Sequence, residues 1–481
     1  MEEGCVSARS RRWGNFKMEL RDIFLDIDKN PYHETDNPTG IINMSTAHND
    51  AISEVVVEKL NQSSLKQWDA SMLPYTPGRL GIPRLRSAIA EFLTQELATP
   101  EPLDPDKFCI ANGVTSLNCM MGYVLCNDGD TILTPSPLYG AIPRDFLFIP
   151  NVKTYPVPLN SKPGVSGTEP FELTVELLED ALKRAKVEGH RVKVLLLTNP
   201  YNPLETVFPR EQVLLCLQFC KRHNLHCVVD EVYVCSIYDP DTPHSSLWGF
   251  HPDQLPDKSK THVMWGFSKD FGMSGTPVGA VYSWNPTVIR SLGCIVDFVQ
   301  VPHFIQMEMA QLLEDREWLQ NVHFATSRRL LRESSEIVMA TLDEIGVPYV
   351  KPSAGFFIWA NFSKYLLEDS LNGESALKSS FLHNGLAILS GAAFYYDNEY
   401  GWFRIVFTVP RGQLIEAMKR LKQAFPSQPG SIKVEQNAGK GVPGILCPLI
   451  NLVQCGVIRH QAKLGAKDDQ PEERCEWGGR V

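Results

Sequence analysis

The feature that most constrains the fold of this chain is an alternation of short apolar runs with segments of helical periodicity between about Lys107 and Ser283. Each run is almost entirely apolar, which is typical of strands buried on both faces of a parallel sheet. Strands that alternate with helices form βαβ units, so the pattern predicts an α/β fold. The predicted strands span residues 108–111, 131–134, 192–198, 226–229, 262–266 and 279–282.

Helical segments fill the intervals between these strands. Apolar residues spaced by three and four positions mark one face of a helix that begins near Val114. The same spacing predicts helices over residues 171–187, 211–223 and 306–319. From about Ser327 the apolar strands become fewer and the amphipathic segments more frequent, which favours a smaller α+β domain. Its expected elements are helices over 327–345 and 412–425 and strands near 355–359, 387–389 and 402–407.

The charge balance and the apolar segments exclude several classes of protein. The 481-residue chain has 46 Lys and Arg against 56 Asp and Glu, a net charge of −10, whereas nucleic-acid binding needs a basic surface. No secretory signal is recognised near the N-terminus, and the longest apolar stretch, 442–458, is broken by proline and glycine. The 12 cysteines include no Cys-x-x-Cys pair. We expect a cytoplasmic protein without a metal site, a membrane span or a nucleic-acid partner.

Polar sequences follow four of the predicted strands at their carboxyl ends, where ligands bind in open parallel sheets. Residues 112–116 open a helix, whose free N–H groups suit a phosphate, and residues 199–203 offer two asparagine amides between prolines. Asp230 precedes Tyr233 by three positions, and Lys269 follows the next strand. Each of these alone has an ordinary explanation: a helix cap, a turn, a solvated acid or a surface lysine.

Together, the four sites supply a phosphate cup, an amide, a carboxylate and a lysine, which are the groups that pyridoxal 5'-phosphate requires. The lysine forms the Schiff base, and the carboxylate keeps the pyridinium nitrogen protonated. At about 4 Å and an effective dielectric near 20, these opposite charges attract by about 4 kcal/mol, or roughly three pKa units. The sequence therefore predicts a pyridoxal-phosphate site at this edge of the sheet.

Four longer stretches resemble a known family. They read Ser-Lys-Asp-Phe-Gly-Met-Ser-Gly at 268–275, Asn-Pro-Tyr-Asn-Pro-Leu at 199–204, Asp-Glu-Val-Tyr at 230–233 and Gly-Trp-Phe-Arg at 401–404. Between about Asn37 and Phe425 the chain resembles the class I/II aminotransferases of the aspartate aminotransferase fold. Within them it is similar to the 1-aminocyclopropane-1-carboxylate synthase-like proteins of animals.

The resemblance implies the fold type of pyridoxal-phosphate-dependent transferases, with a mostly parallel seven-stranded sheet in a large domain and a smaller α+β domain. We expect an N-terminal arm at 1–30, then a segment at 31–85 that belongs to the small domain and makes interdomain and dimer contacts. The large cofactor-binding domain would span 86–315 and the C-terminal small domain 316–426. Residues 427–481 read as a tail without structure of its own, because their composition favours disorder.

The resemblance also assigns roles to individual residues. It implies that Lys269 is the Schiff-base lysine, that Asp230 is the partner of the pyridinium nitrogen, and that Asn202 and Tyr233 face the ring oxygen. Arg404 would bind the substrate α-carboxylate, a bidentate geometry that lysine cannot copy.

Roles for further residues around the cofactor are implied on the same basis. Tyr139 would stack on the cofactor ring, and Val114 and Thr115 would bind its phosphate. In this family a tyrosine of a neighbouring subunit completes the phosphate site. Tyr75 is the candidate here, followed by Arg79, so a homodimer is implied.

The chain departs from the family pattern at the phosphate site. The family has an arginine two residues after the glycine that matches Gly275, where it pairs with the phosphate, and this chain has Pro277. Three residues before Lys269 many relatives have a phosphate-binding serine, and this chain has Gly266. The loss of one charged hydrogen bond costs about 1.5–3 kcal/mol, so we expect weaker cofactor binding.

The chain departs from the family pattern at two other positions, the first on the substrate side and the second without an assigned consequence. Plant synthases have a glutamate that recognises the sulfonium of S-adenosylmethionine, and this chain has His48 in its place. Imidazole cannot replace a carboxylate beside a sulfonium, so we expect no cyclopropane-forming activity. The turn that reads Asn-Pro-Leu-Gly in relatives ends in Glu205 here.

Two functions remain open at this point. In the first, the protein is an enzyme that uses a pyridoxal-phosphate Schiff base to deprotonate Cα of a small-molecule amino acid, leading to transamination or a related elimination. In the second, it is a degenerate family member, weakly or non-catalytic, that acts as a dimeric binding protein. Pro277 and Gly266 favour the second. The first is favoured by five intact side chains, which are Lys269, Asp230, Tyr233, Asn202 and Arg404.

Overall fold

In the computed structural model, the described residues are 19–63, 79–163, 169–243 and 245–425, together with Ser7, Ser10, Ala70, Leu73 and Pro74. Contacts group Met1–Ile432 into one compact unit. The predicted tail at 427–481 lies outside the described residues. The boundaries expected inside the unit, at 30, 85 and 315, stay predictions.

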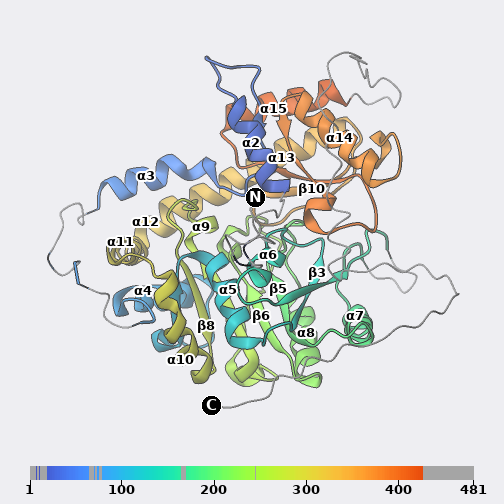
Figure 1. Ribbon diagram of the computed structural model, residues 1–481. Coiled ribbons are helices and arrows are strands. Elements are labelled where there is room, and N and C mark those ends of the chain that lie inside the picture. Colours follow the sequence, from blue (N-terminus) through green and yellow to red (C-terminus); the bar gives the residue numbers. More distant parts are fainter. Residues whose placement is uncertain are drawn as a thin grey trace, which may run out of the picture. The chain divides into compact units, whose positions relative to one another are not determined.

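A seven-stranded sheet forms the centre of this unit, as predicted, in the order β2-β8-β7-β6-β5-β3-β4 (Figure 1). All neighbouring pairs are parallel except the two that involve β8. The mostly parallel α/β sheet is therefore confirmed. Its strands are β2 (Phe108–Ala111), β3 (Thr131–Ser136), β4 (Lys153–Pro158), β5 (Val192–Thr198), β6 (His226–Asp230), β7 (Thr261–Gly266) and β8 (Gly279–Ser283).

The residue-by-residue prediction missed β4, which contains Pro156 and Pro158. Proline cannot donate to a strand ladder and is confined to edge strands. β4 pairs with β3 alone and forms an edge of the sheet, so its free side tolerates both prolines.

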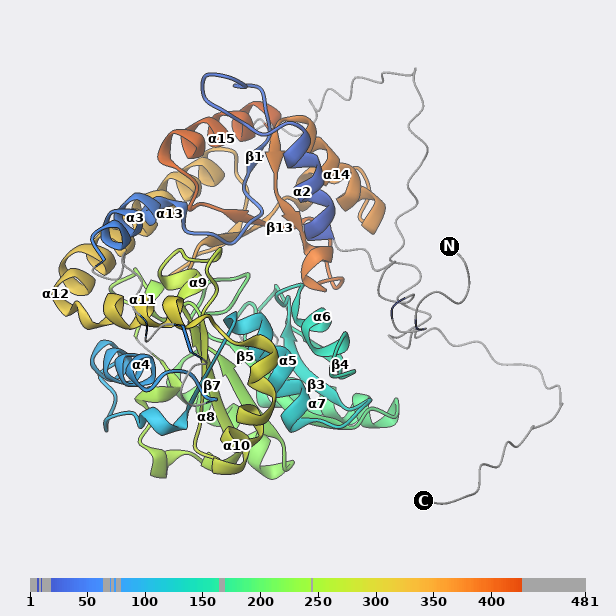
Figure 2. The same ribbon diagram turned by 60° about the vertical axis from the view of Figure 1, so that its left-hand side comes forward.

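Successive residues of the strands belong to different apolar clusters, which is the period of two expected when both faces of a sheet are buried. In β2, Cys109 and Ala111 pack in one cluster with helices α5 (Gly113–Leu125), α6 (Ile142–Leu147) and α10 (Pro286–Ile295). Phe108 and Ile110 pack in the other. That cluster includes α4 (Pro83–Glu96), α7 (Val175–Val187), α8 (Arg210–Arg222) and α11 (His303–Glu314). Helices thus cover both faces of the sheet (Figures 1 and 2).

A second, four-stranded sheet of order β12-β13-β10-β9 is antiparallel, as expected for an α+β region. A short parallel pair, β1 with β11, joins residues 42–43 to the C-terminal part of the chain. Helices α13, α14 and α15 contact these strands. The bounds are β1 (Ile42–Asn43), β9 (Tyr349–Val350), β10 (Phe357–Asn361), β11 (Leu386–Ala387), β12 (Leu389–Ser390), β13 (Trp402–Val406), α13 (Ala325–Glu344), α14 (Leu371–His383) and α15 (Arg411–Ala424).

The remaining helices are α2 (Glu19–Lys29), α3 (Ser53–Asn61), α9 (Phe267–Asp270) and α12 (Arg316–Trp318). Figure 2 shows α2 beside α14, and Glu19 forms an ion pair with Lys378 of α14 at 3.1 Å. Among the helices of the described residues, none alone has the length and apolar character to cross a membrane, although the bent pair Pro286–Val299 and His303–Glu314 meets both criteria together.

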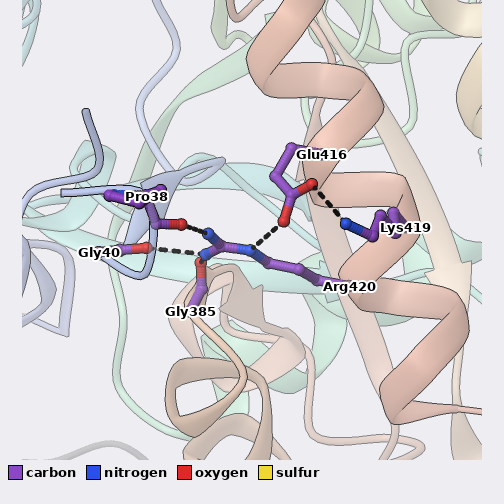
Figure 3. Close-up of polar contacts among 6 residues, drawn as sticks. All are labelled: Pro38, Gly40, Gly385, Glu416, Lys419 and Arg420. Carbon is purple, nitrogen blue, oxygen red and sulfur yellow. Dashed lines mark hydrogen bonds and ion pairs between the residues drawn. The ribbon is translucent and has the colours of Figure 1, made fainter. Parts of the chain in front are cut away.

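Arg420 of α15 fastens the N-terminal segment to the C-terminal part of the chain (Figure 3). Its buried guanidinium donates to the carbonyl oxygens of Pro38 at 2.6 Å, Gly40 at 2.7 Å and Gly385 at 3.0 Å. Glu416, one turn earlier, accepts from Arg420 Nε at 3.1 Å and from Lys419 Nζ at 3.3 Å. One side chain therefore satisfies three backbone acceptors from two distant segments.

Arg420→Ala should lower the free energy of unfolding by about 3 kcal/mol, because buried carbonyl groups lose charged donors. Lys419→Ala is the matched control, since Lys419 binds the same glutamate but its side chain is 63% exposed. The control should change stability by less than about 0.5 kcal/mol. Urea unfolding measures both, and equal losses for the two variants would contradict the assignment.

Candidate functional site

Two neighbouring parallel strands carry the central pair of the site. β6 ends at Asp230 and β7 ends at Gly266, in a register that pairs Asp230 with Met264. Helix α9 follows β7 directly and contains Lys269. The carboxylate and the amine therefore lie at the same edge of the sheet, close enough for their charges to act on each other.

Lys269 is half-buried, and its Nζ donates to the carbonyl oxygen of Ala47 at 2.6 Å. Burial, followed by the positive charge of Arg404, lowers the pKa of this amine to about 8, against the opposing effect of Asp230 and Glu205. A lysine in water has a pKa of about 10.4. At neutral pH the Lys269 amine is therefore uncharged in a much larger fraction of molecules, which suits a nucleophile or a base.

Asp230 is 9% exposed, and its Oδ1 accepts from the Val232 N–H at 3.2 Å. Burial raises the pKa of its carboxyl to about 7, while that N–H and Lys269 lower it. A cation placed against this carboxyl would stabilise the charged form. The adjacent Glu231 has a structural role, because its carboxyl already accepts hydrogen bonds from the Ser246 hydroxyl and the Leu247 N–H, both at 2.6 Å.

Arg404 of β13 is 2% exposed and lies between the rings of Phe357 and Phe394, with its guanidinium carbon 4.1 and 4.7 Å from their centroids. It donates to Asn202 Oδ1 at 3.1 Å and to the Ser45 carbonyl oxygen at 2.6 Å. Its Nε has no hydrogen-bond partner among the described residues. Burial lowers the pKa of this guanidinium to about 10, so it stays charged at neutral pH and remains able to bind an anion.

Tyr233 lies beside this arginine, with its ring edge-on to Phe356 and Phe357 at centroid distances of 5.3 and 5.9 Å. Burial, first, and the negative charge of Glu205 raise the pKa of its phenol well above the ordinary value, whereas Arg404 lowers it. Tyr233 is therefore a neutral hydrogen-bond donor over the physiological range.

Tyr139 follows β3 at the same edge of the sheet. Burial raises the pKa of its phenol, and the charges of Asp230 and Arg404 both act on it. A Cβ at the next residue, Gly140, would lie 2.2 Å from the Ala393 carbonyl oxygen. Close backbone packing against the C-terminal part of the chain therefore positions Tyr139.

The first turn of α5 contains Val114 and Thr115. Within this described helix, the side chain of Asn112 at the N-cap makes no capping hydrogen bond. The N-terminal N–H groups of a helix carry partial positive charge and suit an anion. Thr115 donates instead to Asp145, a buried acid whose pKa it lowers against the larger effect of burial.

The backbone packs closely where α5 meets β7 and β8. A Cβ at Gly279 would lie 2.8 Å from the carbonyl carbon of Gly113, and one at Gly113 would lie 3.0 Å from Pro277 Cβ. A Cβ at Gly266 would lie 2.8 Å from the Val278 carbonyl oxygen. Packing therefore favours glycine at 266, because the Cβ of a serine would require the backbone at Val278, just before β8, to shift.

The predicted site residues are largely brought together. Shared hydrogen bonds or mutual charge effects connect Lys269, Asp230, Tyr233, Tyr139, Asn202 and Arg404. Val114 and Thr115 lie at the start of α5, Arg79 is exposed, and Tyr75 lies outside the described residues. The roles of all these residues stay predictions. The described part of the chain contains no cluster of His, Cys, Asp or Glu that could hold a metal ion.

Several groups of the site carried no recognisable signal in the sequence. The carbonyl oxygens of Ser45 and Ala47 accept from Arg404 and Lys269, and backbone acceptors leave no trace in residue type. The sequence shows that Glu205 departs from the Asn-Pro-Leu-Gly turn of the family, but this departure does not predict that its side chain is buried beside the site.

The residues fit pyridoxal 5'-phosphate. Asp230 is a buried acid with no ion pair to any described residue, Lys269 is a half-buried amine of low pKa, and the uncapped first turn of α5 suits an anion. The unpartnered Nε of Arg404 leaves one donor, among the described residues, for a carboxylate. Position 277, where the resemblance leads us to expect an arginine that pairs with the phosphate, is a proline.

Known proteins resemble this chain over most of its length. The model of the family "Aminotransferase class I and II" matches residues 39–421. Human 1-aminocyclopropane-1-carboxylate synthase-like protein 1 is 37% identical over 420 residues, which cover 87% of this chain and 82% of the relative. Human "Probable inactive 1-aminocyclopropane-1-carboxylate synthase-like protein 2" is 35% identical over 408 residues, covering 85% and 71%.

Solved structures show the same fold. Aspartate aminotransferase from Thermus thermophilus with maleate has a TM-score of 0.69 at 19% identity, over 88% of this chain and 100% of that one. An aromatic aminotransferase from Pyrococcus horikoshii has a TM-score of 0.65 at 24% identity, over 84% and 98%.

Gly266→Ser should lower the free energy of unfolding by about 1–3 kcal/mol, because the added atoms overpack the contact with β8. Gly275→Ser is the matched control, since a Cβ there meets no atom within 4 Å. That control should stay within about 0.5 kcal/mol of the wild type. Urea unfolding of both variants checks this, and an unchanged midpoint for Gly266→Ser would refute the packing argument.

Proposed function

The chain belongs to the class I and II aminotransferase family, and on that premise we propose that it is a pyridoxal-phosphate-dependent enzyme that acts on a small-molecule amino acid. The observation that carries the proposal is that Lys269 and Asp230 lie at the same edge of the sheet, each within reach of the other's charge. Arg404, buried and partly unpartnered, supplies a place for the substrate α-carboxylate.

Pyridoxal 5'-phosphate, when bound, supplies an aldehyde carbon and a ring that accepts electrons. Lys269 Nζ would bind that carbon, and after the substrate amine displaces it, the same amine would take the proton from the substrate Cα. Asp230 would hold the proton on the ring nitrogen, and Tyr233 and Asn202 would bind the ring oxygen. Tyr139 would stack on the ring, while the N–H groups at Val114 and Thr115 would hold the phosphate.

The reaction that follows Cα deprotonation is proposed as transamination or a related elimination. Both use Lys269 as the base and Arg404 to orient the carboxylate, so the present residues serve either outcome. His48 lies 3.3 Å from Asp50 and 3.4 Å from Ser274 Oγ. By the sequence resemblance, this imidazole takes the position of a carboxylate in plant synthases, and we do not propose cyclopropane formation.

A second candidate function is a weakly or non-catalytic dimeric binding protein. Pro277, which occupies the position of the phosphate-binding arginine beside Gly113, supports it. One human relative also has "probable inactive" in its name. For either function we propose a cytoplasmic homodimer in which Tyr75 completes the neighbouring site.

Borohydride reduction in the presence of saturating pyridoxal 5'-phosphate, followed by peptide mass mapping, distinguishes the two candidates. The enzyme should carry a pyridoxyl adduct on Lys269, because its low pKa and burial favour that amine over exposed lysines. Lys269→Ala should lose this adduct. If the wild type carries no adduct on Lys269, the first candidate is wrong and the second is supported.

Pro277→Arg should tighten cofactor binding by about tenfold or more, because it restores a charged partner for the phosphate next to the start of α5. Thr276→Arg adds the same charge at an exposed neighbouring position and serves as the control. Equilibrium titration with pyridoxal 5'-phosphate measures both dissociation constants. An unchanged constant for Pro277→Arg would show that another group already provides this contact.

A further inference from the structure

Glu205 is a buried acid that the functions above do not use. It ends the turn after β5, and its φ of 57° lies in the left-handed region, which favours the glycine that relatives have at this position. Its N–H donates to the Tyr201 carbonyl oxygen at 2.6 Å, and its own carbonyl oxygen accepts from Ser353 at 3.0 Å and Ala354 at 3.2 Å. The backbone is thus held from both sides in a conformation that is unfavourable for glutamate.

The side chain of Glu205 is completely buried against Gly355. A Cβ at Gly355 would lie 1.8 Å from Glu205 Oε2, so the glycine provides the room for the carboxyl. Neither carboxyl oxygen has a hydrogen-bond partner of regular geometry within the described residues. Burying an ionised carboxylate without such partners costs free energy. The protonation state of Glu205 should therefore depend strongly on the charges around it.

Charged and titratable groups face this carboxyl from three elements. Arg404 comes from β13, Lys269 from α9, and Tyr233 and Tyr238 from the segment after β6. Burial raises the pKa of Glu205 well above its ordinary value, while Arg404, the Phe356 N–H and Lys269 lower it. The carboxyl and the Arg404 guanidinium are thus both buried, act on each other through their charges, and form no hydrogen bond.

We propose that Glu205 is a further residue of the substrate site, which must hold a proton for a carboxylate to bind at Arg404. The inference rests on the proposed function, because it takes Arg404 as the carboxylate-binding group. An anion at Arg404 removes the positive charge that stabilises ionised Glu205, and ionised Glu205 repels that anion. By linkage, carboxylate binding and proton uptake at Glu205 strengthen each other.

Calorimetric titration of the cofactor-loaded protein with propionate tests this, at pH 6 to 9 and in buffers of different ionisation enthalpy. Wild-type protein should take up protons on binding, and its affinity should fall by up to about tenfold per pH unit above the pKa of Glu205. Glu205→Gln, which mimics the protonated acid, should take up as much as one proton fewer on binding. Its affinity for propionate should exceed that of the wild type by up to about tenfold per pH unit above the pKa of Glu205.

Two further variants keep the result interpretable. Glu205→Gly restores the residue of relatives and relieves the left-handed backbone, so it should fold and should lose the same proton uptake. Glu308→Gln removes another buried carboxyl, which lies on α11 and accepts from the Ser63 hydroxyl at 2.8 Å, and should behave as wild type.

Arg404→Gln separates failure of this inference from failure of the proposed function. If propionate binding persists in Arg404→Gln, the assigned substrate site is wrong and this inference falls with it. If binding depends on Arg404 but Glu205→Gln and Glu205→Gly keep the proton uptake and pH profile of the wild type, the inference alone is overturned.

Discussion

The site depends on the burial of opposite charges at the carboxyl edge of the seven-stranded sheet. Asp230, Glu205 and Arg404 are buried and Lys269 is half-buried, and each shifts the pKa of at least one of the others. A buried charge is tolerated when it is paired or when its pKa moves toward the neutral form. The lowered pKa of Lys269 and the raised pKa of Asp230 are two results of that one constraint, and they match the needs of a Schiff-base amine and of a partner for a ring cation.

Backbone packing determines how closely these charges can meet. Glycines at 113, 266 and 279 let α5, β7 and β8 approach at the point where the phosphate cup is expected. Gly140 lets the turn after β3 pack against the Ala393 carbonyl oxygen, and Gly355 leaves room for the Glu205 carboxyl. The departure at Gly266 thus has a steric reason, whereas nothing in the described packing requires Pro277.

The strands of the central sheet, and the site residues at their carboxyl ends, could be predicted from the sequence. The apolar runs located β2 and β5 to the residue, and because parallel strands share one carboxyl edge, Asp230 and Lys269 were predicted to meet. Strand β4 was not predicted because it contains two prolines, which only an edge strand accommodates. Helix α2 was not predicted because its contact with α14 joins segments that are distant in the sequence. The positions of Ser45, Ala47 and Glu205 depend on contacts between distant segments, which periodicity and spacing do not encode.

The central claim is that Asp230 holds the proton of a cofactor ring nitrogen while Lys269 binds the aldehyde carbon. Nitrogen NMR of the protein loaded with pyridoxal 5'-phosphate labelled with nitrogen-15 in the ring reports that proton directly. We predict the chemical shift of a protonated nitrogen at pH 8 in the wild type and of an unprotonated nitrogen in Asp230→Asn. The same shift in both proteins would contradict the account.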